Sequence, residues 1–263
     1  MKVKLIQMTQ NPIDVMWTAA RTCYSAKSPI EMWEELGSRY SEFGVNETQD
    51  REAIDNVNEE ISKHWNLVKK VLDSGHDSIA EHCYFTFCIE GVSRALLAQI
   101  TRHRAGIVFS VMSQRYVEIK ESKQELFEIL DRYEGPEMKE FCDKYFVDFK
   151  GRIDSALIKE LFNYLDAIEG GEKPEDARMY LPNATKTNIT MSVNLRELMH
   201  MSNLRLCSRS QAEIRQLFQA IKKEVEARDE RLASLLVPSC VSNGCCKEIK
   251  PCYYYKKVLK DEK

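Results

Sequence analysis

The sequence lacks long apolar runs, a large excess of charge and the glycine-rich motifs of common nucleotide-binding folds. No apolar segment approaches the roughly 20 residues that cross a bilayer, so we expect no membrane span. The net charge of the 263 residues is only −3, so no overall field attracts nucleic acid or an anionic membrane. The absence of Gly-x-Gly-x-x-Gly and Walker A patterns excludes Rossmann and P-loop nucleotide binding. Any anion site must therefore be a local cluster of basic residues.

Disulfide staples are not expected either, because the nine cysteines are odd in number and the chain can bury a sizeable core. Residues 1–5 lack the apolar core of a signal peptide, so we expect reduced thiols and a cytoplasmic protein. The C-terminal tail, residues 237–263, has no Cys-x-x-Cys pair, and adjacent Cys245 and Cys246 are awkward ligands for one tetrahedral ion. A reduced tail facing solvent is favoured, and a zinc site that also uses Cys240 and Cys252 is the alternative.

Hydrophobic periodicity predicts strands alternating with helices, in one large domain or two small ones. Strands are expected at residues 3–5, 83–89, 113–119 and 185–193; the second is buried largely on both sides and ends before Gly91. Helices are expected at residues 11–24, 46–73, 92–102, 123–168, 174–181, 194–206 and 211–236. Residues 25–50 give mixed turn and helix signals, and Asn194 is a candidate cap for the helix that follows it.

Basic side chains are densest in residues 94–116. A short apolar segment leads to Arg102, His103 and Arg104, and Ser113 and Arg115 follow after a loop that contains a glycine. A guanidinium group costs several kcal/mol to bury unpaired, and it forms bidentate hydrogen bonds with phosphate or carboxylate oxygens. The segment therefore requires an anionic ligand or a group of protein carboxylates. Composition alone does not decide between them.

The helix expected at residues 194–206 carries polar groups on two sides. At about 100° per residue, Arg196, His200 and Asn203 share one face, and Asn194 and Arg205 point roughly the other way. Such a helix suits two ligands or two subunits. A helix with one solvated face is the alternative.

The segment from His76 to His82 contains two histidines, two acids and a serine. A zinc site with His76, His82 and Cys83 is conceivable, but the spacing does not fix the geometry of these side chains. Histidines that bond to the backbone are the favoured interpretation, and no metal site is predicted.

Taken in order, these residues resemble the motifs of the flavin-dependent thymidylate synthases. Arg102–Arg104 with Ser113–Tyr116 is similar to the family signature, and residues 75–87 are similar to the turn and strand before it. Residues 177–182 resemble the short arginine helix of the family, and 194–205 its late helix. The similarity runs from about residue 19 to residue 214, which is most of the chain.

The resemblance implies an α+β fold, with a central and mostly antiparallel sheet flanked by helices, in one domain over residues 1–236. It implies methylation of dUMP to dTMP, with 5,10-methylenetetrahydrofolate as carbon donor, FAD as redox carrier and NADPH as reductant. Tetrahydrofolate is then the folate product, and no cysteine nucleophile is needed. It also implies a homotetramer with FAD at the subunit interfaces, so that a site is shared between subunits.

The resemblance implies roles for individual residues as well. FAD would contact Ser78, Arg102, His103, Arg104, Asn194, Arg196 and His200. The substrate dUMP would contact Gln99, Arg102, Ser113, Gln114, Arg115, Arg178 and Arg205. Arg205 is the expected catalytic residue, because an arginine at the N3 edge would stabilise negative charge as it develops on the pyrimidine.

Two other functions stay open. A non-catalytic nucleotide- or flavin-binding regulator could use the same fold, since the loop at residues 105–112 departs from the family pattern. A nucleic-acid-binding module could use the arginines, although the near-neutral charge and the lack of interleaved aromatic residues argue against it.

Overall fold

The computed structural model describes residues 1–42, 51–119, 121, 123–131, 136–147, 155–253 and 255. Parts of two expected helices, residues 46–50, 132–135 and 148–154, lie outside these ranges. Within them, no helix combines the length and the apolar character that crossing a membrane requires.

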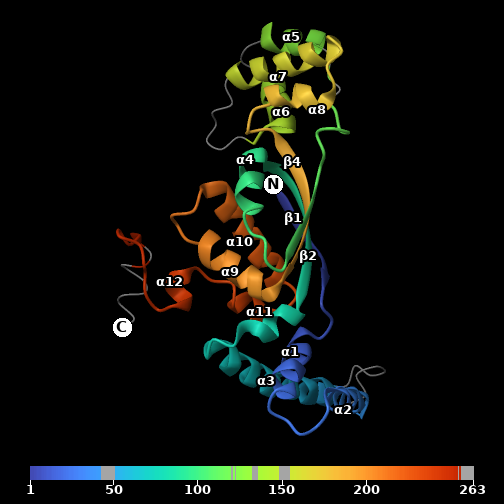
Figure 1. The fold of residues 1–263 in the computed structure, drawn as a ribbon, viewed down its shortest axis with the longest axis vertical. Coiled ribbons are helices and arrows are strands. Elements are labelled where there is room, and N and C mark those ends of the chain that lie inside the picture. Colours follow the sequence, from blue (N-terminus) through green and yellow to red (C-terminus); the bar gives the residue numbers. More distant parts are fainter. Residues whose placement is uncertain are drawn as a thin grey trace.

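A four-stranded sheet forms the centre of the molecule (Figure 1). The strands are β1 (Lys2–Met8), β2 (Tyr84–Ser93), β3 (Ile107–Val111) and β4 (Lys186–Asn194). They lie in the order β1-β2-β4-β3, and every neighbouring pair is antiparallel. This arrangement confirms the predicted α+β fold with a central antiparallel sheet.

Strand β2 does not end before Gly91, contrary to the prediction. Gly91 has a φ of +69°, and the pairing of β2 with β4 shifts between Ile89 and Val92. The glycine therefore allows a bulge inside the strand, which continues to Ser93.

The two sides of β2 differ in burial. Phe85 and Phe87 are fully buried in the main core, whereas Tyr84 is exposed. The helices α4 (Arg94–Ile100), α9 (Leu195–Arg205) and α10 (Ala212–Glu226) pack against the sheet. The prediction of burial on both sides was wrong, because an antiparallel sheet can leave one face uncovered within a chain.

The third strand also lies earlier than predicted. Gly106, with a φ of +65°, turns the chain straight into β3, whose first residue, Ile107, pairs with Val193. The residues predicted as extended, 113–119, instead contain a turn in which the Val117 N–H donates to the Ser113 carbonyl oxygen at 3.0 Å. The strand has only five residues, Ile-Val-Phe-Ser-Val, and so short an apolar run has no periodicity that distinguishes a strand from a helical segment.

The helices follow the prediction in place but not always in length. The elements before β2 are α1 (Pro12–Thr22), α2 (Pro29–Glu42), α3 (Arg51–Asp73) and the 3₁₀ helix η1 (Asp77–His82). The long region 123–168 contains α5 (Lys123–Asp131), α6 (Pro136–Tyr145) and α7 (Ser155–Glu169). The short elements α8 (Pro174–Ala177) and η2 (Arg178–Tyr180) follow.

The predicted helix 211–236 is interrupted as well. After α10, the side chain of Asp229 accepts hydrogen bonds from the N–H groups of Arg231 and Leu232 and so begins α11 (Glu230–Ser234). A capping aspartate inside an apolar periodic pattern marks this break. The last helix is α12 (Ser239–Ser242).

The apolar side chains form two clusters. The larger one lies on the covered face of the sheet, and the smaller one includes Leu126, Phe146 and Leu161. Figure 1 shows the helices α5 to α8 of the smaller cluster as a lobe beyond one end of the sheet.

The C-terminal tail does not simply face solvent. Cys240 in α12 is 8% exposed, whereas Cys245 is exposed. The expectation of a solvent-facing tail is therefore wrong for Cys240. The structure describes all nine cysteines, and none of them forms a disulfide.

Candidate functional site: a buried histidine between a carboxylate and an arginine

The Arg102–Arg104 turn is positioned by a well-fixed α4. The Oγ of Ser93 caps this helix by accepting from the Leu96 N–H at 3.0 Å. Buried Glu213, on α10, accepts from the N–H and the Oγ of Ser93 at 2.7 and 2.5 Å. The start of α4 is therefore tied to the core, and its end delivers the turn to a defined place beside α9.

His103 joins this turn to both ends of α9. Its ring is 8% exposed, and its Nδ1 lies 2.9 Å from Oε1 of Glu197. Its Nε2 lies 3.1 Å from both Nε and Nη2 of Arg205. A guanidinium group can only donate, so Nε2 accepts and Nδ1 carries the proton that is donated to Glu197. The three side chains form one hydrogen-bonded chain.

The electrostatics of this chain are those of an anion site. Burial, followed by the charges of Arg205, His200 and Arg102, lowers the pKa of His103 to about 4. Burial is also the largest cause of the raised pKa of Glu197 and of the lowered pKa of Arg205. His103 is therefore neutral at pH 7, and two guanidinium groups stand close together at the edge of the site.

Asn194 connects the sheet to α9. Its Oδ1 accepts from the Glu197 N–H at 2.9 Å, which confirms the predicted cap, and its own N–H donates to the Gly106 carbonyl oxygen at 2.8 Å. A Cβ atom at Gly106 would lie 2.2 Å from the Asn194 side-chain nitrogen. Only glycine fits this close approach at a positive φ.

A cleft of about 700 Å³ opens beside these residues. Arg196, His200 and Asn203 line it, as the shared helix face predicted, together with the backbone at Gly106. Arg196 is exposed and forms an ion pair with Glu81 of η1. Arg205 instead donates to His103, so the polar side chains of α9 have different partners on its two sides.

A second group of predicted residues gathers near α8. Nε of Arg115 lies 2.5 Å from Oε2 of Glu175, and Nε of Arg178 donates to the Glu175 carbonyl oxygen at 3.0 Å. The Oγ of Ser113 accepts from the Arg115 N–H at 3.2 Å. Burial and the charge of Arg178 lower the pKa of Arg94, the first residue of α4. We call Ser113, Arg115 and Arg178 the distal arginine group.

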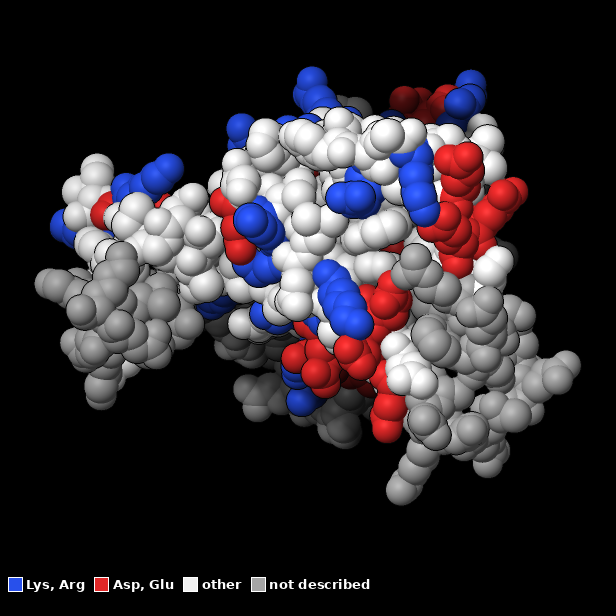
Figure 2. All heavy atoms as spheres, turned by 90° about the horizontal axis from the view of Figure 1, so that it is seen from below, with Lys and Arg blue, Asp and Glu red and all other residues white. Residues whose placement is uncertain are grey.

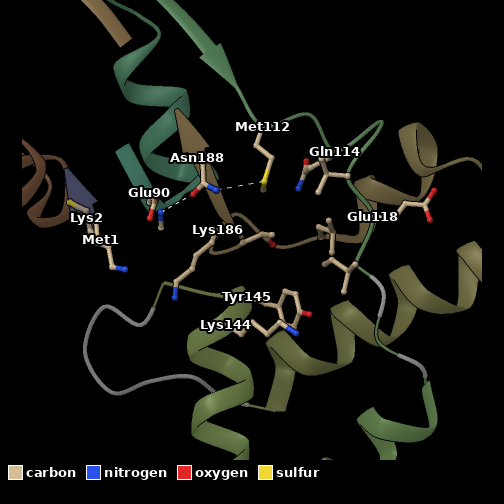
Figure 3. Close-up of a pocket in the computed structure, with 15 residues that line it drawn as sticks. Met1, Lys2, Glu90, Met112, Gln114, Glu118, Lys144, Tyr145, Lys186 and Asn188 are labelled. Atoms are coloured by element: carbon tan, nitrogen blue, oxygen red, sulfur yellow. Dashed lines mark hydrogen bonds between the residues drawn. The ribbon is translucent and has the colours of Figure 1, made fainter. Parts of the chain in front are cut away.

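Gln114 lines a different cavity of about 490 Å³ between the sheet and the helical lobe. Figure 3 shows Gln114 and Met112 on one segment, with Asn188 of β4 opposite and Tyr145 of α6 below. Oδ1 of Asn188 accepts a hydrogen bond from the Gly91 N–H at 3.1 Å, and Nδ2 of Asn188 donates to the Met112 sulfur at 3.9 Å.

The remaining predicted site residues lie outside the His103 cluster and the distal arginine group, or at the edges of these two clusters. Ser78 is exposed and lines a separate cavity of about 360 Å³ with Cys23 and His76. Arg102 and Arg104 are exposed in their turn, and the Gln99 carbonyl oxygen accepts from Nη2 of Arg205 at 3.4 Å. Within one chain, the predicted site residues are thus divided between separate clusters.

Possible metal ligands also meet in this site. Ligand atoms of His103, Glu197 and His200 lie within 4.8 Å of one another. Both ring nitrogens of His103 are already hydrogen-bonded, however, and Arg102 and Arg205 would repel a cation. The arrangement is better suited to an anion. In the conceivable zinc set of His76, His82 and Cys83, the thiol of buried Cys83 points at the Pro12 carbonyl oxygen, 3.4 Å away.

Comparison with known proteins decides the family. A family model described as "Thymidylate synthase complementing protein" matches residues 4–229. The flavin-dependent thymidylate synthase of Pyrococcus horikoshii is 33% identical over 260 residues, covering 94% of this chain and 90% of that protein. That of Clostridium tetani is 31% identical over 256 residues, covering 95% and 92%. The chain belongs to the flavin-dependent thymidylate synthase family.

The fold of this flavin-dependent thymidylate synthase family member agrees with a solved structure. The Helicobacter pylori enzyme ThyX, in a complex with FAD and dUMP, aligns with a TM-score of 0.65 at 23% identity. The alignment covers 90% of this chain and 100% of that one.

Sequence reasoning missed Glu197, although it stands inside a matched motif. Its signal was the spacing Asn194-x-x-Glu197, in which a capping residue precedes an acid by three positions. Here the Glu197 carboxylate hydrogen-bonds to Nδ1 of His103 rather than to the backbone of the capping residue, Asn194. Asp77 and Glu81, which also line the cleft, were noted without a role.

Proposed function

We propose that this chain methylates dUMP to dTMP, with 5,10-methylenetetrahydrofolate as carbon donor and FAD and NADPH supplying the reducing equivalents. Tetrahydrofolate is the folate product. The observation that carries the proposal is the hydrogen-bonded chain Glu197–His103–Arg205, which holds an arginine in a fixed direction and whose first member, Glu197, lines the 700 Å³ cleft.

The cleft fits the flavin cofactor. FAD carries an anionic diphosphate and a hydrogen-bonding ring system, and Arg196, His200 and Asn194 line a space of about 700 Å³. The missing side chain at Gly106 lets the backbone approach a ligand closely. When bound, FAD supplies the hydride that reduces the transferred carbon. Arg102, His103 and Arg104 would border it from the neighbouring turn.

The substrate site is completed by a second copy of the chain. Arg205, Arg102 and Gln99 would hold the pyrimidine, while the distal arginine group and Gln114 would bind the phosphate through guanidinium forks and a hydroxyl. Because these two sets of residues form separate clusters within one chain, we assign them to different subunits of a homotetramer. Ser78 would likewise reach FAD from another subunit.

Arg205 acts on the pyrimidine as a fixed positive charge. Since His103 accepts from two of its nitrogens, the free donors of the guanidinium can face N3 and the adjacent oxygen of uracil. Charge that develops there during attack by C5 is stabilised without reorganisation of the site.

No cysteine takes part in this scheme. Burial raises the pKa of Cys83 to about 12, which makes it a poor nucleophile, and the residues that line the 700 Å³ cleft include no cysteine. A cytoplasmic location completes the proposal, since the proposed substrates are small soluble molecules.

The test is release of tritium from C5-labelled dUMP by the purified protein, with the folate and NADPH present. We expect a yellow protein that releases tritium and forms dTMP. Arg205→Ala should lower turnover by roughly 100- to 1,000-fold and leave the flavin content unchanged. A protein that binds FAD and dUMP but releases no tritium would be the non-catalytic regulator.

Nucleic acid remains an unfavoured partner. In the face shown in Figure 2, acidic and basic side chains alternate in small groups, without one continuous basic surface. Retention of the protein on DNA or RNA that declines steeply with salt would contradict this interpretation.

A further inference from the structure

Four cysteines that are far apart in the sequence meet at one cavity. Cys207 follows the end of α9, and the other three belong to the C-terminal tail: Cys240, Cys246 and Cys252. All four line a single cavity of about 300 Å³. Exposed Cys245 is not among the lining residues.

Only one member of the adjacent pair Cys245 and Cys246 lines the cavity, so two adjacent residues need not bind the same tetrahedral ion. The tail ligands are not the adjacent pair 245–246 but three cysteines at equal intervals, each separated by five residues. The fourth, Cys207, comes from an element that the sequence gives no reason to connect with the tail. Four thiols from two segments are the ligand set of a structural zinc site.

Polar contacts already join the tail to α9 and to the segment that follows it. The Oγ of Ser242 donates to Oδ1 of Asn203 at 3.0 Å, and Nη2 of Arg209 donates to the Lys250 carbonyl oxygen. The N–H of Arg209 points at the Cys207 sulfur at 3.5 Å. A backbone N–H two residues beyond a cysteine stabilises a thiolate in this geometry.

The charges around the cavity suit an anionic metal centre. Arg209, Lys222 and Lys247 line it, with Glu248 as the acidic member. Four thiolates and one dication carry a net charge of −2, which these basic groups offset.

We propose that one zinc ion binds here through four thiolates, those of Cys207, Cys240, Cys246 and Cys252. Binding releases the four thiol protons and needs no oxidant. Among the described residues, the possible metal ligands whose atoms lie within 4.8 Å of one another are those around His103, not the four cysteines. The sulfur atoms must therefore move closer together as the ion binds. The ion fixes the tail against the end of α9, two residues beyond Arg205.

The first test measures metal in the full-length protein, purified under reducing conditions with added Zn²⁺ and then freed of loose metal by gel filtration. We expect about one zinc ion per chain. After chelation, Co²⁺ should give the visible bands of a tetrahedral thiolate site, at longer wavelengths than flavin absorption. A wild-type protein with neither zinc nor these bands overturns the proposal.

Matched variants separate this site from adventitious binding. Cys246→Ser and Cys252→Ser should each weaken zinc affinity by at least about 100-fold, more than the loss of an outer partner costs. Cys245→Ser should keep the wild-type affinity. Equal losses in Cys245→Ser and Cys246→Ser would contradict the assignment.

The outcome of these zinc-binding tests does not depend on whether the protein catalyses the proposed reaction. A chelator should lower the melting temperature of the wild type and leave that of Cys246→Ser unchanged, because the ion stabilises only a chain that can bind it. An inactive protein that retains zinc would support this site and refute the proposed reaction.

Discussion

Arg205 donates two hydrogen bonds of 3.1 Å to the same atom, Nε2 of His103. These residues are 102 positions apart in the sequence. The contact fixes the direction of a guanidinium group that would otherwise rotate through many rotamers. Glu197 then decides which nitrogen of the histidine is free to accept.

Glu197→Ala should lower kcat about 10- to 100-fold, because His103 loses the partner that fixes its tautomer. The KM for dUMP and the flavin content should change much less, since Glu197 acts through another residue. Glu197→Gln keeps an oxygen that can accept from Nδ1 and should restore most of the activity. If Gln and Ala give the same loss, the carboxylate charge matters and not the hydrogen bond.

Two inactive variants should complement each other if subunits share a site. Co-expressed Arg178→Ala and Arg205→Ala should regain about a quarter of the wild-type activity, because half of the interfaces in a random tetramer are mixed and each then contains one intact site. The measurement is tritium release by the mixed protein.

The control pairs two residues of the same group. Co-expression of Arg115→Ala with Arg178→Ala should restore nothing, since no mixed interface then contains an intact distal arginine group. Restoration in both mixtures, or in neither, would contradict the division between subunits.

Stability should fall as the pH falls from 6.5 towards 4. His103 has its pKa lowered from 6.5 to about 4, so in this range the unfolded chain binds a proton that the folded chain does not. The loss should be at most about 3 kcal/mol. Urea unfolding at pH 7 and pH 5 would measure it, with His103→Asn expected to show a shallower dependence.

Glu197 contributes with the opposite sign. Its pKa is raised by burial, so its folded form takes up a proton more readily and gains stability as the pH falls. To remove this contribution, the protein with His103 and the His103→Asn variant should both carry Glu197→Gln. A pH dependence unaffected by His103→Asn would contradict the lowered pKa.

Gly106→Ala should destabilise the fold and loosen the cap of α9. The added Cβ would lie 2.2 Å from Asn194, and a φ of +65° costs a residue with a side chain about 1–2 kcal/mol. Thermal unfolding should report the loss, and flavin binding should weaken with it.

Gly37→Ala is the matched control. Gly37 lies within α2, and among the described residues no atom outside the local backbone lies within 4 Å of an added Cβ, so alanine should raise stability by roughly 0.5–1 kcal/mol. Equal losses in the two variants would show that Gly106 has no special constraint.

Local patterns predicted much of this molecule because they act over a few residues. The cap at Asn194 and the shared face of Arg196, His200 and Asn203 follow from helix geometry alone. The bulge at Gly91 could not be read in the same way, because a glycine that ends a strand and one that kinks it have the same sequence signature.

The contacts of the site depend on tertiary structure. The meeting of His103 with Arg205, and of Cys207 with the tail, requires segments 102 and 33 or more positions apart to pack together. Side-chain identity alone does not specify such pairs. The family motif named the residues, but it did not say which of them touch within one chain.

Strand β4 enters α9 with no intervening loop, since Asn194 is both the last residue of the strand and the cap of the helix. A slip of one residue in the pairing of β4 would turn its side chains to the opposite face and rotate the start of α9 by about 100°. Arg196 and Arg205 would then both leave their positions. Correct strand alignment during folding is thus a precondition for assembling the residues of the proposed site.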